Sequence, residues 1–155
     1  MGAGYVLGSD RTPETVLAVR VGGPLSSLRA KAVALYQLLM TLLSSRLAMM
    51  APLLVFVDNL ILLHILDHCG RLNYHPGPTV VIHFDVIMQL LGVLRQWHLP
   101  IRLVKVKSHS GCLLNDRSDE QADRGYTVET TEAFPAPPKF TSLTLRIRNP
   151  VREFQ

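Results

Sequence analysis

Hydrophobic positions in the first third of the chain change from a period of two to a helical period. Apolar and polar residues alternate loosely from Tyr5 to Val21, which predicts a two-stranded antiparallel hairpin with its turn at Pro13 and Glu14. After "GGP", the Ser26/Ser27 pair can cap a helix that is expected to reach about Met49. Its apolar residues at helical spacing are Leu28, Ala32, Leu35, Leu39 and Leu42.

The rest of the pattern adds two strands and three helices. "LLVFVD" is a short aliphatic run without alternation, which predicts a strand buried on both faces with Asp58 at its end. "IRLVKV" predicts the next strand, and the "NYHPGP" segment predicts a loop. Helices are expected at Leu60 to His68, at Val80 to Trp97, and from about Asn115 to just before Gly125.

Composition supports one α/β domain followed by an extension. The 155 residues are 48% hydrophobic but only 6% aromatic, so an aliphatic, layered core is expected. The predicted domain spans residues 1–125. Residues 126–155 form a Pro-rich linker and a C-terminal extension, in which "TSLTLRIRN" alternates as a strand does.

Net charge, apolar stretches and the two cysteines limit the partners and the environment that are expected for this protein. A net charge of +4 fits a polyanionic partner such as nucleic acid without requiring one. The longest apolar stretches are interrupted by charge and fall short of the roughly 20 residues of a membrane span, so no membrane partner is expected. Cys69 and Cys112 lack metal-ligand spacing, which favours a reduced, intracellular protein. The N-terminal segment shows neither a secretory nor a mitochondrial signal pattern.

The order of these elements, together with two motifs, resembles the ribonuclease H family, retroelement type. The motifs are "VFVDN", in which an Asp ends a strand, and "KSHSG" followed by "NDRSDEQAD", which is similar to the family's histidine loop and last catalytic Asp. "GAGYVL" and "LRAKAVALYQLL" are similar to its second strand and first helix. The resemblance covers Gly2 to Gly125 and implies a three-layer fold, a mixed β-sheet flanked by helices.

The resemblance also implies a chemistry. In that family two Mg²⁺ ions about 4 Å apart are held by four acidic groups and drive hydrolysis of the RNA strand of an RNA/DNA hybrid. The third acidic position falls on Asp58 and the fourth on Asp119, and His109 and Asn115 occupy supporting places. Asp58 and Asp119 would be metal ligands only in an active enzyme. Otherwise no cofactor is expected.

The other two acidic positions depart from the family pattern. Lys31 stands where the helix should carry the catalytic Glu, and its ammonium would repel a divalent ion by several kcal/mol, even at an effective dielectric near 20. If the alignment holds, Lys31 is expected to pair with Asp58 in place of the cation; the alternative is an ordinary surface lysine. The family's first strand, which carries the first Asp, would precede "GAGYVL" and is missing from this sequence.

A missing central strand would leave two rows of backbone groups unpaired. We therefore expect its place to be filled either by the tail "TSLTLRIRN" or by a segment of a partner protein.

Basic residues offer candidate nucleic-acid contacts. Arg102, Lys105 and Lys107 are expected to alternate along one strand face, where they would touch a phosphate backbone or simply face solvent. Asn115 joins them as a candidate for nucleic-acid binding. Arg146, Arg148 and Arg152 in the tail leave the same two alternatives open.

Three functions are compatible with these features. The first is an inactive ribonuclease H-like module, a structural or RNA-contacting component of a larger ribonucleoprotein such as a mitochondrial ribosome. The second is an active ribonuclease H, truncated or split, whose partner supplies the first strand and its Asp. The third is a protein–protein scaffold without nucleic acid. Lys31, in place of the catalytic Glu, favours the inactive module. A mitochondrial location is expected with that host, with nuclear and cytoplasmic locations left open.

Overall fold

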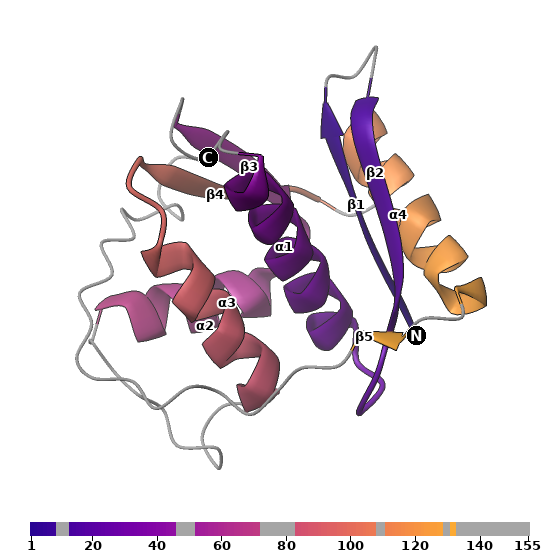
Figure 1. Ribbon diagram of the computed structural model, residues 1–155, viewed down its shortest axis with the longest axis horizontal. Helices are drawn as coiled ribbons and strands as arrows, with labels where there is room; N and C mark the ends of the chain where they lie inside the picture. Colours follow the sequence, from indigo (N-terminus) through magenta and orange to yellow (C-terminus); the bar gives the residue numbers. More distant parts are fainter. Residues whose placement is uncertain (9–12, 46–51, 72–82, 108–110, 129–130, 133–155) are drawn as a thin grey trace.

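The computed structural model describes residues 1–8, 13–45, 52–71, 83–107, 111–128 and 131–132. These ranges contain four α-helices and five strands, whose arrangement is drawn in Figure 1. The strands are β1 (Gly2–Gly8), β2 (Pro13–Val21), β3 (Leu53–Val57), β4 (Ile101–Lys105) and β5 (Thr131–Glu132). The helices are α1 (Ser27–Ser44), α2 (Leu60–Arg71), α3 (Phe84–Arg95) and α4 (Leu113–Arg124), which is followed by a 3₁₀ turn at Gly125–Thr127.

The strands form two separate small sheets in the described part of the chain. β1 and β2 pair antiparallel from Gly2↔Arg20 onward, and β5 adds two residues parallel to β2 on its other edge. β3 and β4 pair parallel, with Leu53 opposite Ile101 and Val57 opposite Lys105. The expected mixed α/β class is confirmed at this level, with both parallel and antiparallel pairs.

Helix α1 packs against β1 and shares one buried core with residues of both sheets (Figure 1). Ser26 caps it as predicted, because its side chain accepts a hydrogen bond from the Arg29 backbone N–H. The buried Leu35, Leu39 and Leu42 come from the predicted apolar stripe. None of the helices in the described ranges has both the length and the apolar content needed to cross a bilayer.

Several element boundaries differ from the sequence prediction. Pro13 opens β2 opposite Gly8, so Pro13 and Glu14 lie in a strand and not in the predicted turn. α1 ends at Ser44, where the C-cap Ser45 N–H bonds back to Thr41 O, rather than at Met49. α3 begins after His83, which adopts a left-handed backbone with φ 58° and therefore interrupts a helix from Val80. The predicted loop at residues 73–78 lies outside the described residues.

Strand β3 is buried on one face only, so the prediction of burial on both faces is wrong. Val55 and Val57 are 7% exposed, but Leu54 and Phe56 on the opposite face are 51% and 48% exposed. Helix α4 packs mainly against β1 and β2, and none of the larger helix contacts in the described ranges is with β3.

Helix α4 approaches strand β1 unusually closely at Gly4. A Cβ at this position would lie 2.5 Å from the Gln121 Cβ and 2.6 Å from the Ala122 backbone nitrogen. Ser118 of the same helix donates a hydrogen bond to the Gly4 carbonyl at 2.9 Å. The glycine therefore sets the position of the face of α4 that carries Asn115 and Asp119.

Gly4→Ala should force α4 away from the hairpin and cost about 2 kcal/mol of folding free energy, as overpacked sites do. Denaturant unfolding measures the loss. Val16→Ala is the control, because Val16 pairs with Val6 in the same hairpin but is 49% exposed, and should change stability by only about 0.5 kcal/mol. Equal stability of Gly4→Ala and the unmodified chain would contradict the close approach.

A buried arginine ties α1 to α3. Arg29 is 5% exposed and bonds both oxygens of Asp85, at 2.8 and 2.7 Å, while its Nε donates to the Gly22 carbonyl at 2.7 Å. These hydrogen bonds hold the pKa of Asp85 below its ordinary value of 3.8. The two charge-assisted hydrogen bonds to Asp85 replace the water that the Arg29 guanidinium loses on burial.

Asp85→Asn should destabilise the protein by about 2 kcal/mol at neutral pH, less than the ~3–5 kcal/mol of a fully buried pair because the Asp85 side chain is 39% exposed. Because the folded-state pKa is depressed, the contribution is present above pH 3.8 and is lost as pH falls through the folded-state value. The unfolding free energies of the unmodified chain and of Asp85→Asn should therefore become equal in acid. Asp123→Asn, on the exposed end of α4, is the control and should change little at any pH.

Candidate functional site

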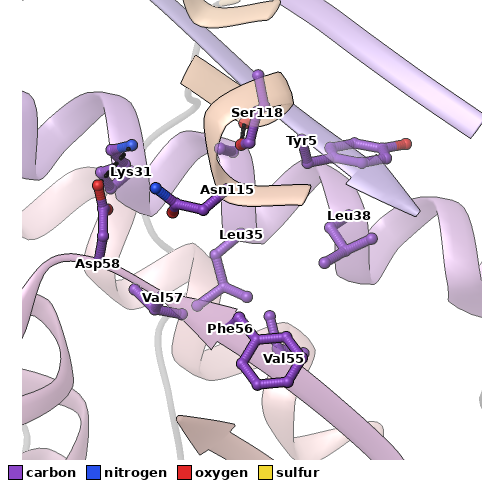
Figure 2. Close-up of a pocket in the computed structure, with 12 residues that line it drawn as sticks. Tyr5, Lys31, Leu35, Leu38, Val55, Phe56, Val57, Asp58, Asn115 and Ser118 are labelled. Carbon is purple, nitrogen blue, oxygen red and sulfur yellow. Dashed lines mark hydrogen bonds and ion pairs between the residues drawn. The ribbon is translucent and has the colours of Figure 1, made fainter. Parts of the chain in front are cut away.

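Three charged side chains from three elements meet at one point, called here the Lys31 cluster: Lys31, Asp58 and Asp119. The Lys31 ammonium lies 2.6 Å from Asp119 Oδ1 and 3.2 Å from Asp58 Oδ2. The Lys31–Asp58 ion pair expected from the sequence is present, and Asp119 completes it. Figure 2 shows Lys31 and Asp58 facing each other at the edge of a cavity.

Local structure explains why these residues converge. Lys31 lies one turn before Leu35 on α1, and Asp58 follows the last residue of β3. Asn115, Ser118 and Asp119 are spaced i, i+3 and i+4 on α4 and therefore share a face. The sequence prediction identified Asp119 and Asn115 but missed Ser118; the helical spacing was the signal that would have found it.

Burial makes the pairing strong without isolating it from water. The Asp58 side chain is 9% exposed, and those of Lys31 and Asp119 are 24% and 26% exposed. Burial alone lowers the pKa of Lys31, but the hydrogen bond to Asp119 and the charges of both carboxylates outweigh it, so the pKa lies above its ordinary value of 10.5. The ammonium is therefore charged throughout the neutral range.

A groove extends from the Lys31 cluster between the two sheets, and we call it the inter-sheet groove. Its walls are Tyr5–Gly8 of β1 and Leu53–Phe56 of β3, with Leu38 of α1 and Leu114, Asn115 and Ser118 of α4 completing it. It encloses about 670 Å³, including the part open to solvent. A cavity that shares Tyr5, Leu38 and Asn115 continues it to Lys31 and Asp58 (Figure 2).

Asn115 carries an unsatisfied donor inside this groove. The residue is 8% exposed, and its Nδ2 has no hydrogen-bond partner. Figure 2 shows its amide reaching toward Lys31 and Asp58. A buried amide N–H without an acceptor costs about 1–3 kcal/mol, so an acceptor from outside the described residues would stabilise the site.

The other predicted site residues are not brought to this cluster. Arg102 and Lys105 of β4 point to opposite faces, because Arg102 is level with the exposed Leu54 and Lys105 with the buried Val57. The prediction of a single basic face is therefore wrong; an interval of three residues reverses the side of a strand. Lys105 donates to the Val106 carbonyl, and Lys107 is exposed beyond the strand. His109 and the tail arginines Arg146, Arg148 and Arg152 lie outside the described residues.

The cluster does not fit a pair of Mg²⁺ ions. An ammonium already contacts both carboxylates, and no third His, Cys, Asp or Glu joins them in the described ranges. A divalent ion about 4 Å from that ammonium would be repelled by about 8 kcal/mol at an effective dielectric of 20. What the arrangement can do is place one positive charge against two carboxylates, which leaves one negative charge uncompensated, and hold three elements together.

Comparison of the chain with protein-family models, with curated proteins and with solved structures finds no match.

Lys31→Met should destabilise the protein by about 2 kcal/mol at neutral pH, because it leaves two partly buried carboxylates without a counter-charge. The folded-state pKa of Lys31 is raised, so the contribution of Lys31 to stability is fully present below pH 10.5. This contribution is lost only as the pH rises through the folded-state pKa. The difference in unfolding free energy should be constant from about pH 6 to about pH 9 and shrink in stronger base.

Lys105→Met is the matched control for that series. Lys105 is also a half-buried lysine, but its ammonium bonds a backbone carbonyl instead of carboxylates. Its replacement should cost less than half as much as Lys31→Met. A Lys31→Met protein as stable as the unmodified chain at neutral pH would show that the ion pairs contribute nothing.

Proposed function

We propose that this chain is a ribonuclease H-like pseudo-nuclease: a catalytically inactive module that serves as a structural or RNA-contacting component of a larger ribonucleoprotein, such as a mitochondrial ribosome. The observation that carries the proposal is the position of the Lys31 ammonium, within 2.6 and 3.2 Å of the two carboxylates that the family resemblance marks as metal ligands. An internal cation in that place supports structure rather than hydrolysis.

The arrangement of elements supports the same proposal. An antiparallel hairpin, a helix beneath it, a strand ending in Asp58 and a last helix bearing Asp119 occur in the order that the resemblance implies. Asp58 and Asp119 are far apart in sequence yet share one cation, as two positions of a former metal site would. The separation of the strands into two sheets is the departure from the implied single sheet.

The proposed contact with RNA rests on positive charge at the protein surface. The chain carries a net charge of +4, and the exposed Arg102 and Lys107 lie outside the Lys31 cluster. Cations at such positions bind phosphate without reading sequence, so RNA affinity should fall steeply with salt.

The competing hypothesis of an active ribonuclease H requires Lys31 to leave both carboxylates and a partner to supply the missing ligands. Lys31 comes from α1, whose buried Leu28, Ala32 and Leu35 hold the helix in the core. A partner strand could bring an additional Asp, but it would not remove the ammonium.

Incubation with an RNA/DNA hybrid and Mg²⁺ tests the proposal. The unmodified chain should show no cleavage above a no-protein control, because the Lys31 ammonium already contacts both carboxylates and would repel a divalent ion. Lys31→Glu should gain stability from millimolar Mg²⁺ in thermal unfolding, since three carboxylates then converge, whereas Lys105→Glu should not. Metal-dependent cleavage by the unmodified chain at about 1 s⁻¹ or faster, the lower end of typical enzymes, would overturn the proposal.

A further inference from the structure

The edge of β3 that faces away from β4 has no strand partner in the described residues. Leu53 N–H donates to the Pro100 carbonyl and Val57 O accepts from Val106 N–H, both at 3.0 Å. Residues 53, 55 and 57 therefore direct their backbone groups to β4. By alternation, Leu54 and Phe56 present theirs to the inter-sheet groove.

The edge of β1 that faces away from β2 is open in the same way. Val21 N–H donates to the Met1 carbonyl at 2.7 Å, so the odd-numbered residues of β1 exchange hydrogen bonds with β2. Gly4 and Val6 then face the groove. The Gly4 carbonyl is satisfied by Ser118, at 2.9 Å, which leaves Val6 as the open position.

Three independent observations at the groove indicate the same kind of ligand. Open backbone groups face the groove at Leu54 and Phe56 of β3 and at Val6 of β1, which suits another polypeptide backbone. The buried Asn115 amide lacks an acceptor such as a backbone carbonyl. Leu54 and Phe56, about half exposed, offer apolar surface beside the opening. Small-molecule sites do not need open backbone groups on two facing strands, whereas an added strand uses them on both sides.

We propose that the inter-sheet groove is a strand-acceptor site and that its occupant is the chain's own segment 141–149, "TSLTLRIRN". Residues 141–149 lie outside the described residues, so the assignment rests on their sequence and on the geometry of the groove. Leu143, Leu145 and Ile147 fall on one side of an extended strand, and the polar residues Thr144, Arg146 and Arg148 fall on the other. The apolar side matches the Leu35 and Leu38 surface of α1 that lines the cavity.

The length of chain that follows β5 permits this pairing. β5 ends at Glu132 beside β2, and the groove lies on the far side of β1, about three strand spacings or ~15 Å away. Residues 133–140 can span up to about 26 Å when extended. A tethered segment also has an effective concentration in the millimolar range, which favours it over a strand from another molecule.

Amide hydrogen exchange on the full chain tests the proposal. The N–H groups of Val6, Leu54 and Phe56 should exchange at least about 100-fold more slowly than unprotected amides, because the inserted strand bonds them. In Leu145→Asp/Ile147→Asp, which places carboxylates against the apolar floor, these three amides should exchange near the unprotected rate. The Leu53 and Val55 amides, bonded to β4, should remain protected and show that the fold persists.

Thr144→Asp is the matched control, since it adds a carboxylate to the same segment on the side that faces away from α1, and should leave protection unchanged. Fast exchange of Val6, Leu54 and Phe56 in the unmodified chain would overturn the proposal. So would protection that survives the double substitution; if that protection also rises tenfold with protein concentration, a second copy of the chain is the occupant instead. Neither result depends on whether the protein cleaves nucleic acid.

Discussion

The structure depends on one cation shared by two carboxylates. Lys31 reaches from α1 to Asp58, at the end of β3, and to Asp119, on a helix that packs against β1 and β2. The described strands form no ladder between the two sheets, so this ion pair crosses a boundary that backbone hydrogen bonds do not. The Asp58 side chain is only 9% exposed, and burial lowers the local dielectric and so strengthens the attraction between the charges. The same attraction raises the pKa of Lys31 above its ordinary value.

The inter-sheet groove is different in character at its two ends. Near Lys31 the polar groups are charged and paired, whereas between Val6 and Leu54 the walls consist of backbone edges and half-exposed aliphatic surface. Open strand edges are a liability that folded proteins usually cover, because they pair with whatever extended chain is available. The first end therefore ties α1, Asp58 and α4 together, and the second is where the proposed additional strand would pair.

The sequence predicted the helices and strands better than the contacts between them. Periodicity located the hairpin, the Ser26 cap and the residues of α4 because these are local properties of the chain. The exposure of Leu54 and Phe56 was not predictable from an aliphatic run, since burial of a strand face depends on which helix covers it. The Arg29–Asp85 pair joins residues 56 positions apart, and no local pattern marks such a contact. The Lys31–Asp58 pair was predictable only because the family resemblance placed both residues at one site.

A lysine and a metal ion can bind the same two carboxylates with different consequences. A bound divalent ion exchanges with solvent, leaves coordination positions open to water and substrate, and holds only as long as its concentration permits. The Lys31 ammonium is covalently attached to a helix whose apolar face is buried, has no open coordination position and remains charged to high pH. The site thereby keeps one built-in positive charge between its two carboxylates throughout the neutral pH range. Catalysis at this point would need that fixed charge to be removed first.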